Sequence, residues 1–570
     1  MQHFQPLKPL EYYDISEKTG FLPTTPPLRK LPDPYFAPWE EMMSDFNDLL
    51  LAGKLREKVH QLPLLDYRRL KTVEEYRRAF LILCMLSHSY VWGKHEIASE
   101  TLPANLAVPW IEIAEYLGVC PVVCHAAVVL WNYRLLDKEG PIELNNLAAL
   151  ATYSGSLDES WFYLVTTAIE SAGAPCLSQI VDAITNIQEG HLDGLQTNLE
   201  IIRTALASMN DVLKRMYEKC DPYVFYWKIR PYLAGWENMA EAGLPLGLIY
   251  EGAESFWTEQ TDEYADISHL NEAERLLNQY RRYAGGSAAQ SSLIAALDVA
   301  FGVDHYKTGE KPSFIIKDAE LVPNDRYTKL PPPSPADDMH PTSSAASPQK
   351  EEQSTSPPPY KRTNKNTFLK AMRKYMPRRH REFLEDLEEA TNIRPFIIQL
   401  EENYRNGCST SAELNIIHTY NDCLHQLKLF RDKHVQIVTL YIVNQARKGP
   451  NIPHGGFAIE NANKNTSNTA SPHNDLYPQT RLETSPGIRK NSKADKVAQM
   501  FPQLGLARKL DANAKVVRGT GGTNVMPFLK QSRDETADMK IKLNPEQSDE
   551  EAESVSSSLE QRWSNWIFRR

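Results

Sequence analysis

Between positions 411 and 446 the chain reads SAELNIIHTYNDCLHQLKLFRDKHVQIVTLYIVNQA. Large side chains recur in it at spacings of 4, 3, 4, 3, 4, 3 and 4, at Ile416, Tyr420, Cys423, Leu427, Phe430, His434, Ile437 and Tyr441. This spacing is typical of one face of an α-helix. We therefore predict a single long helix over 411–446 whose seam, defined by these eight residues, packs against a core.

The same helical spacing appears in most of the chain. Val73, Tyr76, Phe80 and Leu83 form one stripe, and Thr72 has the spacing of a capping box with the glutamate three residues later. No segment sustains the alternation expected of strands, and no unit repeats at a fixed length. The sequence predicts an all-α fold.

The composition of the 570 residues is that of a folded protein, with 42% hydrophobic and 24% charged residues, which excludes a wholly disordered or collagen-like chain. The net charge of −10 gives no basic field, so neither nucleic acid nor a membrane is an expected partner. No apolar run approaches the ~18–20 residues that cross a bilayer, and the first residues lack an export signal. Seven scattered cysteines are typical of free thiols in a reducing compartment, and we expect a cytoplasmic protein.

Three segments are too poor in apolar residues to form a core. Ten of the 38 prolines lie between 321 and 360, and we predict a disordered insertion over 321–362. Asn, Ser, Pro and Gly dominate the second segment, which predicts a low-complexity loop over 448–510. The third predicts a disordered tail over 541–570, whose aromatic end either docks a partner or is a frayed terminus.

His434 is the most informative single residue, because it lies on the seam while Arg431, Asp432 and Lys433 mostly face elsewhere. A buried imidazole on a helix is either a core histidine bonded to a carbonyl or an axial haem ligand whose second nitrogen is held by a neighbouring group. Spacing alone leaves both interpretations open.

Two further charged residues lie among apolar or aromatic neighbours. Arg230 lies within YVFYWKIRPYLAGW (223–236), where its guanidinium needs either an internal carboxylate or the carboxylate of a ligand. Asp298 lies in an apolar helix over 293–301, so we expect it to have a cationic partner. The small residues GGSAAQSS (285–292) that open this helix permit close approach by another helix or by a flat ligand.

Seven short blocks, in order along the chain, resemble those of the indoleamine 2,3-dioxygenase family: LPANLAVP (102–109), YLAGW (232–236), YEG (250–252), GGSA (285–288), MRKYMP (372–377), HVQIV (434–438) and GTGGT (519–523). The resemblance covers roughly 13–536, apart from two insertions similar to those of fungal members. It implies a two-domain helical haem dioxygenase fold: a small N-terminal helical domain (1–140) over a larger helical domain (141–320 and 363–447) that holds haem b. A Gly-Thr lid loop and a C-terminal helix would follow over 511–540.

The resemblance also implies roles for individual residues. His434 is similar to the proximal haem ligand, and Asp298 with Arg431 to an ion pair beneath it. Arg230 matches the residue that binds the substrate carboxylate, and Thr520 a loop that closes on the substrate. The positions that match walls of the substrate pocket are Phe162, Tyr163, Thr166, Phe225, Val128, Val129, Ser287 and Ala288. His125 stands where the family frequently has Tyr, so we expect a second polar ring near the pocket.

By the same resemblance, the chain uses haem and O2 to cleave the indole C2–C3 bond of L-tryptophan, giving N-formylkynurenine in the first step of the kynurenine pathway that feeds NAD biosynthesis. The cofactor carries the oxidation, so no protein acid or base is expected. We expect a monomer served by an electron donor such as a cytochrome b5. The alternative is a haem protein that binds O2 or signals without dioxygenating tryptophan; the match at Arg230 argues against it, because an oxygen carrier needs no carboxylate clamp.

Overall fold

The computed structural model describes residues 7–93, 97–253, 279–309, 367–448, 506, 517–520 and 524–543. The insertion predicted over 321–362 lies outside these ranges, as do almost all of the loop predicted over 448–510 and of the tail predicted over 541–570. Every structural statement below concerns the described residues.

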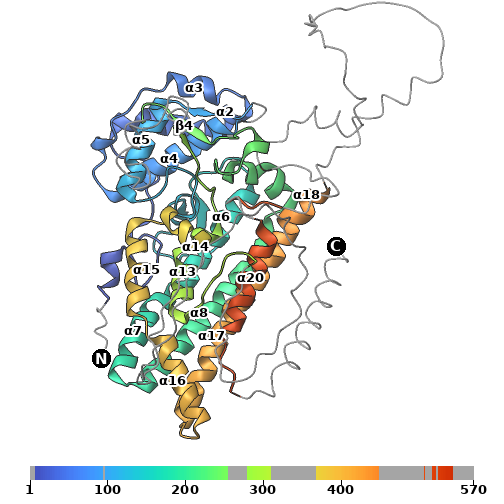
Figure 1. Ribbon diagram of the computed structural model, residues 1–570. Coiled ribbons are helices and arrows are strands. Elements are labelled where there is room, and N and C mark those ends of the chain that lie inside the picture. Colours follow the sequence, from blue (N-terminus) through green and yellow to red (C-terminus); the bar gives the residue numbers. More distant parts are fainter. Residues whose placement is uncertain are drawn as a thin grey trace, which may run out of the picture.

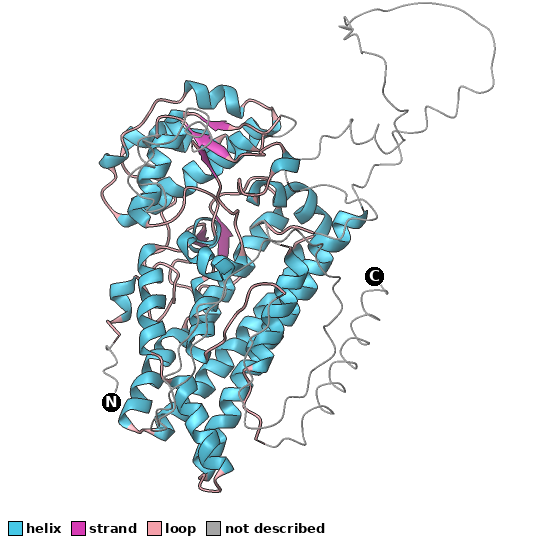
Figure 2. Ribbon diagram, viewed as in Figure 1, coloured by secondary structure: helices cyan, strands magenta, loops and turns pink. Residues whose placement is uncertain are grey.

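The predicted all-α fold is confirmed, and the strands among the described residues are few and short (Figure 2). In one small sheet β4 (Leu248–Tyr250) pairs in parallel with β1 (Thr101–Leu102) and antiparallel with β5 (Tyr280–Arg281). In the other, β2 (Tyr133–Leu135) runs antiparallel to β3 (Leu147–Ala149).

The helices form two groups along the molecule (Figure 1). The group at one end is α1 (Ala37–Ser44), α2 (Phe46–Leu51), α3 (Leu55–Gln61), α4 (Val73–Val91) and α5 (Ala104–Leu117). The other helices are α6 (Leu157–Gly173), α7 (Pro175–Glu189), α8 (Leu192–Lys214), α9 (Met216–Lys219), α10 (Pro222–Val224), α13 (Ser292–Phe301), α14 (Thr367–Met372), α15 (Arg378–Ala390), α16 (Ile393–Arg405), α17 (Ser411–Val438), α18 (Asn444–Lys448) and α20 (Val525–Asp538). The division into domains at residue 140 stays a prediction.

Short helical turns complete the described part. The 3-10 turns are η1 (Leu10–Tyr13), η2 (Pro34–Phe36), η3 (Tyr67–Arg69), η6 (Arg230–Leu233), η7 (Ala240–Ala242), η9 (Ala288–Gln290) and η11 (Arg373–Tyr375). The π-helical turns are η4 (Ala126–Leu130), η5 (Phe225–Ile229) and η12 (Thr439–Val443). Each π turn lies within about five residues of a predicted site residue, His125, Arg230 or His434, and π turns often occur at functional sites.

The helix predicted over 411–446 is confirmed as α17, η12 and α18 in succession, and it lies alongside α8 and α20 (Figure 1). Thr410 and Glu413 form a complete capping box at its start. Six residues of the seam are buried, whereas Phe430 and His434 are half-buried. These two differ because they face a cavity, described below, instead of another helix.

The capping box predicted at the start of α4 is half formed. The hydroxyl of Thr72 accepts the backbone N–H of Glu75 at 3.3 Å, as expected. The carboxylate of Glu75, however, accepts the N–H of Lys71 at 2.9 Å, because it reaches one residue beyond the cap. The helix start is satisfied by both bonds.

The first described residues pack on the larger group of helices. The Tyr13 hydroxyl donates to Asp386 of α15 at 2.5 Å, and the Phe21 ring lies 4.6 Å from the His380 ring of the same helix. A Cβ on Gly20 would touch Ala174, directly before α7. Residues 10–22 therefore join the N-terminal end of the chain to α7 and α15, as Figure 1 also shows.

His88, on α4, ties the N-terminal helices to the segments that lead into the site. Its Nε2 accepts the backbone N–H of Val123 at 2.8 Å, so the proton is on Nδ1, which donates to the carbonyl of Tyr232 at 2.9 Å. The ring also stacks on Trp236, with ring centroids 4.5 Å apart. Burial lowers the pKa of His88 to about 3, so the imidazole is neutral.

All seven cysteines are free, as predicted; five are buried, Cys120 is half-buried and Cys408 is exposed. Among the described helices, none is both long enough and apolar enough to cross a membrane.

Candidate functional site

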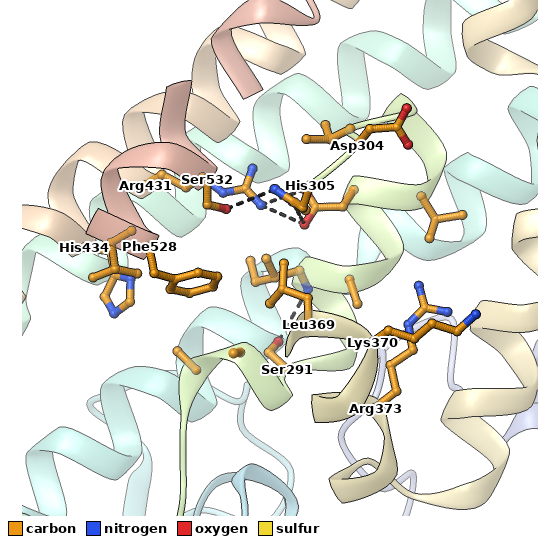
Figure 3. A pocket seen from close by; sticks show the side chains of 18 of the residues that line it. Ser291, Asp304, His305, Leu369, Lys370, Arg373, Arg431, His434, Phe528 and Ser532 are labelled. Carbon is orange, nitrogen blue, oxygen red and sulfur yellow. Dashed lines mark hydrogen bonds and ion pairs between the residues drawn. The ribbon is translucent and has the colours of Figure 1, made fainter. Parts of the chain in front are cut away.

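A cavity of about 350 Å³ lies between α13, α14, α17 and α20 (Figure 3). Apolar side chains make most of its wall, and they are Ala288, Ala289, Ile294, Ala295, Val299, Val303, Leu369, Met376, Phe430, Phe528 and Leu529. The polar wall consists of Ser291, Asp298, Asp304, His305, Lys370, Arg373, Glu388, Arg431, His434 and Ser532. Of the residues predicted for the site, Ala288, Asp298, Arg431 and His434 line this cavity.

His434 projects from α17 into this cavity, close to Phe528 of α20 (Figure 3). Burial, with the positive charge of Arg431 one turn earlier, lowers the pKa of the imidazole to about 4. The ring is therefore neutral at pH 7, with its nitrogen lone pair available to a ligand. Within the described residues, no hydrogen bond holds the ring to a carbonyl, so the interpretation as a bonded core histidine has no support.

Arg431, one turn before His434 on α17, forms the expected ion pair with Asp298. Both carboxylate oxygens of Asp298 accept from Nη2 of Arg431 at 2.7 Å, and Asp298 also accepts from His305 Nε2 at 3.1 Å. His305 Nδ1 lies 2.6 Å from Glu535 of α20. A buried network therefore connects α13, α17 and α20.

Charge sets the protonation of this network. Burial alone would raise the pKa of Asp298, but Arg431 and His305 outweigh it and lower that pKa. Burial would lower the pKa of His305, but the Asp298 and Glu535 carboxylates reverse this effect and raise it. The two carboxylates therefore favour the protonated form of His305, whose positive charge complements theirs.

The sequence did not reveal His305 or Glu535 as part of the site. His305 lies in the loop after α13, and Glu535 follows it by 230 residues. Phe430 also lines the cavity, and its helical spacing had placed it on the predicted seam, one turn before His434. Lys370 and Arg373, on the opposite side of the cavity from His434 (Figure 3), had no signal beyond their charge.

Two glycine-containing segments cross next to the cavity. The backbone N–H groups of Trp236 and Gly286 donate to the carbonyls of Tyr283 and Leu233, at 2.8 and 3.1 Å. A Cβ on Gly235 or on Gly285 would collide with the backbone of the other segment. The small residues at 285–292 therefore permit close backbone approach, but the partner at Gly285 is neither the helix nor the flat ligand expected from the sequence. It is the backbone of the segment around Gly235, which has no side chain at the contact either.

Thr520 lies on this crossing. Its hydroxyl donates to the carbonyl of Gly286 at 2.5 Å, and its own carbonyl accepts the N–H of Gly285 at 3.1 Å. Ser287, which follows Gly286, caps η9 through a complete capping box with Gln290. The structure thus brings Thr520 next to the segment that carries Ser287 and Ala288, of which Ala288 lines the cavity. Residues 521–523 of the Gly-Thr loop are outside the described part.

Arg230 is buried, with its side chain held by the C-terminal part of the chain. Nη1 donates to the carbonyl of Leu506 at 2.7 Å and Nη2 to the carbonyl of Arg518. The guanidinium carbon lies 5.2 Å from the centre of the Tyr226 ring. Arg230 therefore contacts the segment that carries Thr520.

The remaining wall residues predicted for the substrate pocket form a neighbouring cluster that does not line the 350 Å³ cavity. The Phe162 ring lies 4.7 Å from that of Phe225, and Phe225 lies 5.8 Å from Tyr441 of η12. The Tyr163 hydroxyl donates a hydrogen bond to the carboxylate of Glu159 at 2.9 Å. The hydroxyl of Thr166 donates to the carbonyl of Phe162 at 3.0 Å, and Val128 and Val129 are buried in η4. Their pocket role stays a prediction.

His125 is a buried polar ring, but it faces a carboxylate. Its Nε2 lies 2.8 Å from Oε1 of Glu170, and the hydroxyl of Ser291 donates to the same oxygen at 2.7 Å. Since Ser291 lines the cavity, His125 reaches the cavity wall only through Glu170 and Ser291.

Comparison with known proteins decides the family. The sequence model described as "Indoleamine 2,3-dioxygenase" matches residues 9–539. The chain belongs to the indoleamine 2,3-dioxygenase family. It is 34% identical to the indoleamine 2,3-dioxygenase of Saccharomyces cerevisiae over 93% of this chain and 94% of that protein. It is 29% identical to an indoleamine 2,3-dioxygenase of Aspergillus nanangensis (92% and 96%) and 27% identical to a 6-hydroxytryptophan 2,3-dioxygenase of Fusarium equiseti (76% and 85%). As a member of the indoleamine 2,3-dioxygenase family the protein is an oxidoreductase of the dioxygenase class.

Proposed function

We propose that this dioxygenase cleaves the indole C2–C3 bond of L-tryptophan with O2, giving N-formylkynurenine in the first step of the kynurenine pathway towards NAD. The observation that carries the proposal is the neutral imidazole of His434, which faces a largely apolar cavity and is backed by the Asp298–Arg431 ion pair. The buried guanidinium of Arg230, a group suited to binding a carboxylate, supports an amino acid as the substrate.

The residues around the cavity fit haem b. A neutral imidazole on a rigid helix is the usual proximal ligand. Apolar side chains from α13, α14 and α20 suit a flat macrocycle, while Lys370 and Arg373 suit its carboxylates. When bound, haem supplies the chemistry that brings O2 to the indole, and both oxygen atoms enter the product.

The protein then has to orient the substrate and exclude water. Arg230 would hold the amino-acid carboxylate by two N–H bonds in place of the carbonyls of Leu506 and Arg518 that it now contacts. Thr520 and Ser287 would close the edge of the site over the amino-acid group. Phe162, Tyr163, Thr166, Phe225, Val128 and Val129 would enclose the indole, with His125 behind them. No protein acid or base is required.

Ferric haem must be reduced before turnover, so we propose a one-electron donor such as a cytochrome b5. Seven free thiols support a reducing compartment, and we propose the cytoplasm. We propose a monomer.

The experiment is turnover of the haem-loaded protein. The protein is reduced anaerobically with leucomethylene blue, mixed with L-tryptophan and O2, and followed by the absorbance of N-formylkynurenine. Production of one N-formylkynurenine per O2 supports the proposal. Stable O2 binding without product would favour the alternative, a haem protein that binds O2 or signals, and turnover of 6-hydroxytryptophan alone would change the substrate.

A further inference from the structure

A surface hollow of about 620 Å³ lies between the end of α5, η11 and α15. Five cations line it, and they are Lys370, Arg373, Lys374, Arg378 and Arg381; the acidic lining is Glu115, Glu385 and Glu388. We call this hollow, with its five cations, the basic hollow. The whole chain carries a net charge of −10, so the local charge of the hollow is opposite in sign to that of the chain.

The cations of the hollow are only partly neutralised. Arg373 pairs with Glu388 at 2.5 Å, and Arg381 donates to the carbonyls of Gly118 and Met376. Lys374 and Arg378 are exposed, and neither forms an ion pair with a carboxylate of the described residues. Arg378 donates to the carbonyl of Glu115 at 2.9 Å, so its charge remains available.

The basic hollow shares a wall with the His434 cavity. Lys370, Arg373 and Glu388 line both, whereas Lys374, Arg378 and Arg381 line only the hollow. Figure 3 shows Lys370 and Arg373 across the cavity from His434. A protein seated in the hollow would therefore contact side chains that also line the cavity.

We propose that the basic hollow is the docking surface for a one-electron reductant protein with an acidic face. The inference rests on the proposed function, because it requires a reducible iron on His434. In the encounter the partner loses one electron and is oxidised, and the iron gains it in passing from ferric to ferrous; no bond forms or breaks. Elsewhere the net negative charge repels an acidic partner, so the hollow steers it to the cavity wall.

The test is a charge reversal at the two cations that line the hollow alone. The double variant Lys374→Glu with Arg378→Glu should lower the second-order rate constant for reduction by cytochrome b5 about tenfold or more at low salt. The wild-type rate should fall towards that of the variant as salt shortens the screening length from about 30 to 8 Å. Arg405→Glu, on the exposed end of α16 at the far end of the molecule from α5 (Figure 1), is the control for a charge reversal away from the hollow and should change the rate little.

Other readouts separate the possible failures. Turnover driven by leucomethylene blue should be equal in all variants, and its absence in the wild type would contradict the proposed function instead of the docking surface. Binding of isotope-labelled cytochrome b5, followed by NMR with haem-free protein, reports docking without turnover. The neutral pair Lys374→Gln with Arg378→Gln covers misfolding of the reversed variant. Unchanged binding and reduction in both double variants would overturn the proposal, as would saturable binding of pyrophosphate to the hollow without any effect on cytochrome b5.

Discussion

Arg230 is only 2% exposed, and both terminal nitrogens of its guanidinium contact carbonyls of the chain. If it binds the substrate carboxylate, Arg230→Ala should lose about 1.5–3 kcal/mol of charge-assisted bonding, or roughly ten- to a hundredfold in kcat/KM. Arg230→Lys should recover only part, because lysine lacks the fork geometry. The measurement is kcat/KM for tryptophan and for tryptamine, which has no carboxylate. Equal losses on both substrates, or a collapse of Tm, would assign Arg230 a structural role.

His434 allows a cleaner separation of ligand and packing roles, because a second histidine lies on the same helix. His434→Ala should abolish tight haem binding, since it removes the imidazole that faces the cavity. His418→Ala, on the exposed face of α17, should bind haem like the wild type. Haem titration followed by the Soret band makes the comparison. Full haem content in His434→Ala would remove the ligand assignment.

The sequence predicted which residues belong to the site better than it predicted which groups those residues contact. Periodicity placed His434 on a seam but could not separate core from cavity, since both are apolar surroundings. The partner expected for Asp298 was found in Arg431, three residues before His434. His305 and Glu535 could not be predicted, because they meet only when a loop after α13 folds against α20. His125 was expected near the pocket, but its direction depends on Glu170, which no local pattern marks.

Among the elements, α13, α17 and α20 are joined by the buried network around Arg431. Arg431→Met should lower the free energy of unfolding of the haem-free protein by about 3–5 kcal/mol, because it leaves Asp298 with less compensation. Adding Asp298→Leu should recover part of this loss, since no buried anion then remains between α13 and α17. Urea unfolding of the wild type, of each single variant and of the double variant makes the comparison. A double variant that loses the sum of the two single losses would show that the pair is not coupled.

The elements themselves were largely predictable, with limits set by backbone detail. The seam over 411–446 gave α17 because its period persists through eight positions. The π turn η12 inside that stretch was not foreseen, since one extra residue in a turn barely alters the apolar spacing. The half-formed cap at Thr72 shows a similar limit: residue types matched the pattern, but the carboxylate took a neighbouring N–H.

For the whole molecule, acid is expected to be destabilising through two neutral histidines. Burial lowers the pKa of His88 to about 3, and burial with the charges of Arg77 and His125 lowers that of His380 to about 3. Both pKa values are below the unfolded value near 6.5, so these groups favour the folded state above pH 6.5, and that stability is lost as pH falls towards 3. At pH 5 each should cost about 2 kcal/mol.

Urea unfolding between pH 8 and 5 tests this expectation. His88→Gln should be less stable at pH 8, because it disturbs the bonds to Val123 and Tyr232, but it should lose less on acidification. A pH slope identical to that of the wild type would mean that His88 titrates normally. The overall helical architecture followed from the sequence, whereas this contact between distant segments did not, because His88 lies on α4 with no sign of which loop it meets.

The crossing of 232–236 with 283–286 also limits which variants of this enzyme can exist. Gly235 and Gly285 meet backbone to backbone, so any side chain there must push the two segments apart. Gly286, one position on, would place a Cβ 3.7 Å from Val123, an ordinary contact. In a saturation library the first two positions should therefore return only glycine, while alanine should survive at the third. Three glycines that look equivalent in the sequence would therefore tolerate different substitutions.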